Sequence, residues 1–278
     1  MGGKFAVAQW HSFLGDVDAN LDRAAILIAA AADQGADVVV VPELFSTGYS
    51  FSLNVEEMAQ PVPGPTSDCI AGLASKHNVY IFGTILERDG DQVHNCGLFC
   101  SPDEGFVAKY RKVHLFGDEK NSCAPGNEVV VVETRVGKLG LSICYDLCFP
   151  EFIRGTVLAG AEVVLNSTNW LTVGPPQDWD EWQWDWRKTR ALAVARALEN
   201  TVGLVMCCQG AGLCENIYSF GHSCVVSPSG RVLAELGEAE GVTTTEIPMG
   251  QQMDSWRQIA TYLPDRRVEL YGRLLGYK

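Results

Sequence analysis

Two spacing patterns alternate along this chain, and together they restrict it to one class of fold. Short apolar runs such as Val38–Val41 lack polar alternation, which is typical of strands that helices cover. Longer segments with apolar residues at helical spacing occur at residues 18–36, 66–78, 150–161 and 186–200. Residues 79–112 and 128–144 instead have the pattern of strands joined by tight turns. The alternation predicts an α/β protein with layered, mixed sheets.

The composition is that of an ordinary globular protein of 278 residues, with 47% hydrophobic and 20% charged residues. No linker-like stretch divides it, so we predict a single domain over residues 1–278. The net charge of −13 argues against a nucleic-acid partner, because neutralising phosphates requires clustered Lys and Arg. No apolar run approaches the roughly 20 residues of a membrane span, and the first residues lack a signal-peptide core. We therefore predict a cytoplasmic protein outside the membrane, with its ten cysteines reduced.

Three reactive side chains directly follow predicted strands, which is where open α/β sheets place their sites. Glu43 follows "VVVVP", Lys112 follows "FVAKYR", and Cys144 follows "LGLSI". Taken singly, each has an ordinary structural explanation: a solvated or capping Glu, a basic strand edge, and a core thiol. Because the three lie far apart in the sequence, only the fold could bring them together.

As a group, the three residue types fit nucleophilic catalysis. A Cys nucleophile needs a base to form thiolate, and a Glu whose pKa is raised by burial can serve. Attack on a carbonyl or nitrile carbon builds negative charge, which the ammonium of Lys112 and a backbone N–H such as that of Tyr145 would stabilise. A sharp strand-to-helix turn at Cys144 would expose the thiol near a helix N-terminus, as the serine elbow does in other hydrolases.

Three segments, "VVVPELFSTGY", "KYRKVHLF" and "GLSICYDLCFPE", resemble in order the signature segments of the nitrilase superfamily, the carbon–nitrogen hydrolases. The later stretches "AGAEVVLNSTNW", "RALEN" and "GHSCVVSPSGRVL" are also similar, so the likeness covers nearly the whole chain. The resemblance implies a four-layer α-β-β-α sandwich with two mixed β-sheets. It also implies a catalytic triad of Glu43, Lys112 and Cys144. A second acid that positions the substrate is expected shortly after the Lys; Glu119 is the candidate, and Asp118 is the alternative.

The two residues that follow the nucleophilic Cys differ between the branches of this superfamily. Its nitrilases typically have Cys-Trp-Glu, whereas its amidases and carbamoylases have Cys-Tyr-Asp, as in Cys144-Tyr145-Asp146. The resemblance thus favours hydrolysis of a small amide to a carboxylate and ammonia, through a thioester on Cys144. An N-carbamoyl amine or a nitrile is the alternative substrate. The chemistry requires no metal and no organic cofactor, and His114 is predicted to be a structural hydrogen-bonding residue.

The substrate's acyl group is predicted to lie near the end of the strand that closes with "NW". Positions there approach the substrate in the superfamily, and the aromatic side chains nearby could supply apolar contact area. The predicted substrate-contacting residues are Tyr49, Phe116, Tyr145, Asn169 and Trp170. Residues 170–186 hold five Trp among several acids, which favours an uncharged amide over one that carries a carboxylate. A cationic amide or N-carbamoyl amine is the alternative, because aromatic faces and acids both attract cations. The competing interpretation of this segment is a helix start that packs against another subunit.

The resemblance also implies assembly into a homodimer or a larger homo-oligomer, because members of the superfamily generally associate. Two other classes of protein stay open. The first is a binding protein that has kept the fold without activity, against which the intact Glu43, Lys112 and Cys144 argue. The second is a thiol redox protein, but Cys144 and Cys148 form C-x-x-x-C and not the C-x-x-C of oxidoreductases.

Overall fold

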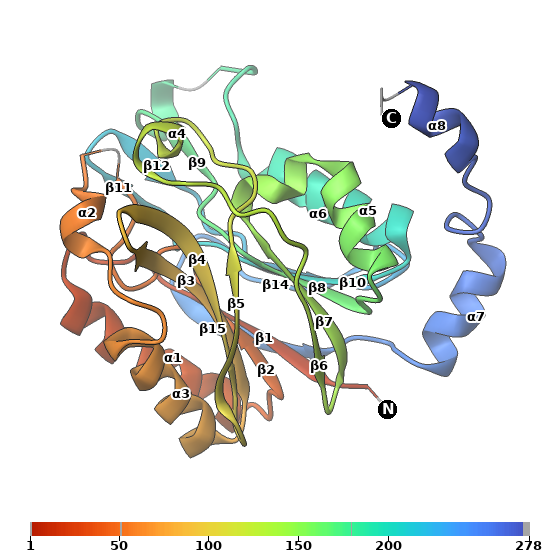
Figure 1. Ribbon diagram of the computed structural model, residues 1–278, viewed down its shortest axis with the longest axis horizontal. Coiled ribbons are helices and arrows are strands. Elements are labelled where there is room, and N and C mark those ends of the chain that lie inside the picture. Colours follow the sequence, from red (N-terminus) through yellow and green to blue (C-terminus); the bar gives the residue numbers. More distant parts are fainter. Residues whose placement is uncertain (1, 51, 179, 275–278) are drawn as a thin grey trace.

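The computed structural model describes residues 2–50, 52–178 and 180–274, and most of its strands belong to two large sheets (Figure 1). The strands of the first sheet are β1 (Lys4–Gln9), β2 (Val38–Val40), β3 (Tyr80–Asp89), β4 (Gln92–Ser101), β5 (Gly105–Arg111) and β15 (Gly241–Glu246). The strands of the second are β6 (Val131–Thr134), β7 (Gly137–Ile143), β8 (Val163–Ser167), β10 (Gly203–Cys207), β13 (Cys224–Val226) and β14 (Val232–Glu235). The two orders are β15-β1-β2-β3-β4-β5 and β14-β13-β10-β8-β7-β6.

Both sheets have three parallel strands at their centre and antiparallel strands around them. In the first sheet β1, β2 and β3 run parallel, and in the second β7, β8 and β10 do. The remaining pairs within these sheets are antiparallel, so each sheet is mixed, as predicted. Because the carboxyl ends of parallel strands meet at one edge of a sheet, the loops after β7 and β8 lie side by side, and a hydrogen bond from Ser167 to the Val41 carbonyl brings the loop after β2 to them.

Helices cover the outer face of each sheet. The helices are α1 (Val17–Asp33), α2 (Val55–Met58), α3 (Pro65–His77), α4 (Glu119–Ser122), α5 (Pro150–Leu158), α6 (Trp186–Asn200), α7 (Gln251–Ile259) and α8 (Val268–Leu274). α1 and α3 pack on the first sheet, and α5 and α6 pack on the second. The Asp16 carboxylate caps α1 by accepting a hydrogen bond of 3.1 Å from the Ala19 N–H, which satisfies a donor that the first turn leaves unpaired.

The core between the two sheets is built from apolar side chains on their facing sides. Phe5, Val7 and Val38 of the first sheet meet Leu139 and Leu165 of the second, and all five are fully buried. Separate apolar clusters lie between each sheet and its helices. The chain therefore forms four layers in the order α-β-β-α, and the predicted sandwich is confirmed.

A third, small sheet lies outside the sandwich, and the sequence did not predict it. Its strands are β9 (Leu171–Val173), β11 (Gly212–Cys214) and β12 (Ile217–Ser219), in the order β11-β12-β9. The hydroxyl of Ser219 donates a hydrogen bond of 2.6 Å to the Asn169 side-chain oxygen. This small sheet thereby holds the segment that follows β8.

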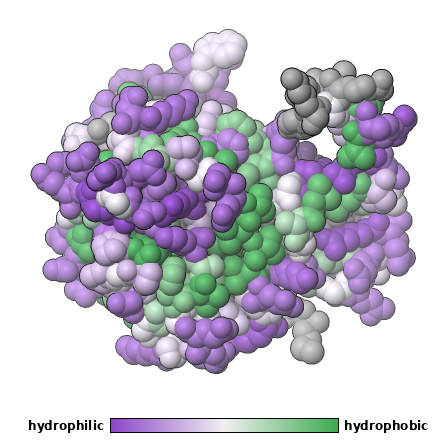
Figure 2. All heavy atoms as spheres, viewed as in Figure 1, coloured by the Kyte–Doolittle hydropathy of each residue, from purple (hydrophilic) through white to green (hydrophobic). Residues whose placement is uncertain are grey.

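The C-terminal segment extends along one side of the sandwich, where α7 and α8 lie apart from both sheets (Figure 1). On the face of the molecule that Figure 1 and Figure 2 both show, hydrophobic side chains gather along the middle and hydrophilic ones border them. Leu158 at the end of α5 and Val268 at the start of α8 are among the exposed apolar residues. Within the described ranges, no helix combines the length and apolarity that a membrane crossing requires.

Candidate active site

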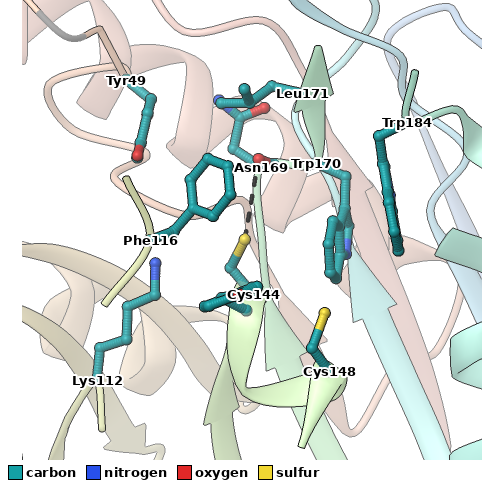
Figure 3. Close-up of a pocket in the computed structure, with 10 residues that line it drawn as sticks. Tyr49, Lys112, Phe116, Cys144, Cys148, Asn169, Trp170, Leu171 and Trp184 are labelled. Carbon is teal, nitrogen blue, oxygen red and sulfur yellow. Dashed lines mark hydrogen bonds between the residues drawn. The ribbon is translucent and has the colours of Figure 1, made fainter. Parts of the chain in front are cut away.

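Three strand ends deliver the predicted reactive side chains to one place. Glu43 follows β2, Lys112 follows β5, and Cys144 follows β7. Their exposed fractions are 0%, 1% and 7%, so burial governs the chemistry of each group. Figure 3 shows the Lys112 ammonium and the Cys144 sulfur entering the same pocket. The Ser167 hydroxyl donates a hydrogen bond of 2.8 Å to the Val41 carbonyl, which joins the two sheets just before the site.

A network of short hydrogen bonds organises the charged groups. The Lys112 ammonium lies 2.8 Å from Glu43 Oε1 and 2.7 Å from Glu119 Oε2. The side-chain amide of Asn95 donates to both carboxylates, at 2.8 Å to Glu43 and 2.9 Å to Glu119. Glu43 Oε2 accepts a bond of 2.9 Å from the Asn169 N–H. One ammonium and one amide thus hold two buried carboxylates in place.

Burial and charge set the protonation of the three reactive groups. Burial raises the pKa of Glu43, while the Lys112 ammonium opposes this rise and the Glu119 carboxylate adds to it. Burial by itself would lower the pKa of Lys112, but Glu119 and Glu43 raise it well above its ordinary value. Burial, reinforced by Glu43, raises the pKa of the Cys144 thiol well above its ordinary value. The resting site therefore contains an ammonium and a neutral thiol.

The backbone at Cys144 forms the sharp turn that the sequence predicted. Its φ is +42°, a left-handed conformation that costs a residue with a side chain about 1–3 kcal/mol. A 3-10 helix over Cys144–Cys148 follows at once, and α5 then begins at Pro150. The turn lifts the thiol out of the sheet, and its sulfur lies 3.9 Å from the Asn169 carbonyl oxygen.

The buried carboxylate of Asp146 fixes this turn from below. One oxygen accepts a hydrogen bond of 2.9 Å from the Ile143 N–H and one of 2.7 Å from the Tyr110 hydroxyl. The other accepts bonds from the His114 N–H and from Nδ1 of the same residue, at 3.1 and 2.8 Å. The His114 ring also stacks on Phe149, with centroids 3.7 Å apart. The prediction that His114 has a structural hydrogen-bonding role is confirmed.

The pocket above the thiol is small and mainly apolar. Its cavity volume is about 100 Å³, so it can enclose only a small ligand. Its lining residues are Tyr49, Lys112, Phe116, Cys144, Tyr145, Cys148, Asn169, Trp170, Leu171 and Trp184 (Figure 3). Among residues 2–50, 52–178 and 180–274, no group of three His, Cys, Asp or Glu side chains is placed to bind a metal ion.

Comparison with known proteins decides the family. The family model described as carbon-nitrogen hydrolase matches residues 4–258. The chain belongs to this family. It is similar to an omega-amidase of Saccharomyces cerevisiae, NIT3, with 31% identity over 286 residues that cover 97% of this chain and 94% of that protein. A nitrilase of Pyrococcus abyssi is 34% identical over 279 residues, which cover 97% of this chain and 99% of that protein.

Solved structures of carbon–nitrogen hydrolases share the fold. The crystal structure of the yeast Nit3, described as a member of the nitrilase superfamily, matches with a TM-score of 0.83 and 30% identity, covering 96% of this chain and 97% of that one. A mutant of an amidase from Nesterenkonia sp. matches with a TM-score of 0.81 and 27% identity, covering 98% and 99%. That structure shows a Michael adduct of acrylamide at the active-site cysteine. The names of these relatives differ in the substrate, and identities near 30% do not choose between them.

Apart from Asp118, the residues that the sequence singled out either line the pocket or, as Glu43 and Glu119 do, bond to Lys112, which lines it. Glu119, and not Asp118, approaches Lys112, because Asp118 is exposed whereas Glu119 turns inward and also accepts the Phe116 N–H at 2.8 Å. Tyr49 and Phe116 line the same pocket from a different side than Trp170 (Figure 3). Of the Trp-rich segment, Trp179 lies outside the described residues.

Four residues at the site were not predicted from the sequence. Asn95 is a buried polar residue of β4, but Gln92, His94 and Ser101 of the same strand are polar too, so its polarity does not mark it in the sequence. Leu171 comes directly after the predicted residues Asn169 and Trp170, and it lines the pocket as they do. Cys148 was considered only as a redox partner and Trp184 only as one of many Trp residues, yet both line the pocket.

Proposed function

We propose that this protein is an amidase that hydrolyses the C–N bond of a small carboxamide through a thioester on Cys144. The observation that carries the proposal is the meeting of a thiol, a carboxylate and an ammonium at one apolar pocket. The thiol of Cys144 lines the pocket, and the carboxylate of Glu43 is bonded to the Lys112 ammonium that lines it too. The adduct on the cysteine of the Nesterenkonia relative supports Cys144 as the nucleophile.

In the first half of the reaction, Glu43 takes the thiol proton as the sulfur of Cys144 bonds to the amide carbon. A neutral resting thiol needs such a base, and the raised pKa of Glu43 makes its carboxylate basic enough to serve. The negative charge that develops on the amide oxygen faces the Lys112 ammonium and the backbone N–H after the nucleophile. Glu43 then gives the proton to the amide nitrogen, the C–N bond breaks, and ammonia leaves.

In the second half, water replaces ammonia. Glu43 accepts a proton from the water as the water oxygen attacks the thioester carbon. The C–S bond breaks, the carboxylic acid leaves, and the proton returns to sulfur. Glu119 positions Lys112 throughout, because both of its oxygens already accept hydrogen bonds from Lys112, Asn95 and the Phe116 N–H.

A matched set of substrates tests this proposal: butyramide, butyronitrile and the N-carbamoyl derivative of propylamine. We expect the wild-type protein to release ammonia from butyramide and to carry a butyryl group on Cys144 in intact-protein mass spectrometry. Cys144→Ser should lower ammonia release on the order of 10³-fold or more while the protein stays folded.

Other results would overturn the amidase assignment. Turnover of the nitrile alone would identify a nitrilase, and release of propylamine alone would identify a carbamoylase. A folded wild-type protein that turns over none of the three would favour the binding-protein interpretation.

A further inference from the structure

We propose that the pocket selects amides with an uncharged, apolar acyl group, and that Trp184 limits the length of that group. This inference rests on the proposed amidase function and adds its substrate class. Two pairs of aromatic side chains carry it. Phe116 packs against Tyr145, and Trp170 packs against Trp184. Figure 3 shows Phe116 on one side of the Cys144 sulfur and Trp170 on the other.

Each aromatic pair is already packed before any substrate enters. Trp170 and Trp184 stack with ring centroids 5.2 Å apart and an interplanar angle of 15°, which leaves no space for a ligand between them. Phe116 and Tyr145 meet edge to face, also with centroids 5.2 Å apart. Aromatic faces of this kind favour contact with apolar groups. The acyl group must therefore lie between the two pairs, above the sulfur.

The charges at the pocket exclude a second carboxylate on the substrate. Among the described residues that line it, Lys112 is the only one with a cationic side chain. That ammonium already bonds to Glu43 and Glu119. A carboxylate at the far end of the acyl group would be removed from water without a cationic partner, and it would be repelled by the two carboxylates of the site.

Trp184 is placed to act as a movable boundary of the pocket. It lies between β9 and α6, outside both large sheets, and its indole N–H donates a hydrogen bond of 2.7 Å to the Thr189 hydroxyl. Its side chain is only half-buried, whereas Trp170 is buried in the core between the second sheet and its helices. A change at Trp184 therefore alters the wall without removing a core residue or a residue of the proposed triad.

The first experiment compares butyramide with succinamate, which has a carboxylate in place of the terminal methyl group. We expect kcat/KM of the wild-type protein to be at least about 100-fold higher for butyramide. Equal or better turnover of succinamate would overturn the substrate class while leaving the amidase function intact. No turnover and no thioester with any amide would instead mean that the proposed function itself has failed.

The second experiment compares Trp184→Ala with Trp182→Ala, since Trp182 lies in the same segment and is 85% exposed. We expect Trp184→Ala to raise the ratio of kcat/KM for hexanamide to that for butyramide roughly tenfold, because space for extra methylene groups opens. Trp182→Ala should leave the ratio unchanged. If Trp184→Ala does not fold, Trp184→Phe should change the ratio in the same direction. A ratio in the folded Trp184 variant that equals that of Trp182→Ala would overturn the role of Trp184.

Discussion

Replacing Lys112 with Met should destabilise the protein in a pH-dependent way. The substitution keeps an unbranched side chain of similar length but removes the ammonium that bonds to both Glu43 and Glu119. Those carboxylates are 0% and 8% exposed, and the Asn95 amide and backbone N–H groups that they keep are uncharged donors. Removing one partner of a buried ion pair costs about 3–5 kcal/mol. For a chain of this size that loss lowers the melting temperature by roughly 6–20 °C.

The loss should be smaller in acid. The Lys112 ammonium is the largest influence that opposes the raised pKa of Glu43, so its removal raises that pKa further above the ordinary value of 4.5. A group whose pKa is higher in the folded state favours folding most at low pH and loses that contribution as pH rises through the folded pKa. The difference in melting temperature between wild type and variant should therefore be larger at pH 8 than at pH 5.5.

Differential scanning calorimetry at both pH values measures this difference, and Lys120→Met is the matched control. Lys120 lies eight positions after Lys112, in α4, and its side chain is exposed. Substitutions of exposed side chains usually change stability by no more than about 0.5 kcal/mol, so the control should change little. Melting temperatures that agree for the two variants, or a deficit of Lys112→Met that is the same at both pH values, would refute the reasoning.

Three further predictions concern the site and its surroundings. Glu43→Gln should fold normally but give no acylation burst in rapid mixing, since an amide cannot carry the thiol proton; a normal burst would remove Glu43 as the base. Asn95→Leu removes a donor from the carboxylate of Glu43, so the acid limb of the kcat/KM profile should move to higher pH, and an unmoved limb would contradict this. Against burial, Arg111 and Lys109 hold the pKa of Glu87 at about 2. The stability this supplies is complete above pH 4.5 and lost as pH falls towards 2, so Glu87→Gln should flatten the fall in melting temperature between pH 5 and pH 3.

The sequence located the reactive groups because each one directly follows a strand. Glu43 and Cys144 end parallel strands of different sheets, and no spacing rule in the sequence states how two sheets face each other. The order of the layers came from resemblance to a superfamily and not from periodicity. The choice between Asp118 and Glu119 required the structure, since both are acids and only the path of the loop after Lys112 decides which one turns inward.

The rest of the site could not be predicted because it depends on long-range packing. Asn95 meets Glu43 across 52 positions of sequence, and nothing local to either residue indicates the contact. Trp184 belongs to a segment without regular structure, where spacing patterns carry little information about orientation. The small sheet of β9, β11 and β12 was missed because three-residue strands are too short for a pattern. The single domain, the homo-oligomer and the cytoplasmic location stay predictions.

The cluster of one ammonium, two carboxylates and a thiol has a consequence for how protons travel. It places one ammonium beside two carboxylates, and each of its four side chains is at most 8% exposed. Losing the sulfur's proton to bulk solvent would add another negative charge there, at high energetic cost. The hydrogen ion should therefore shuttle inside the enclosure, from sulfur to carboxylate to departing nitrogen. Buffer molecules in the solvent would then take no part in proton transfer, and the turnover rate should be independent of their concentration.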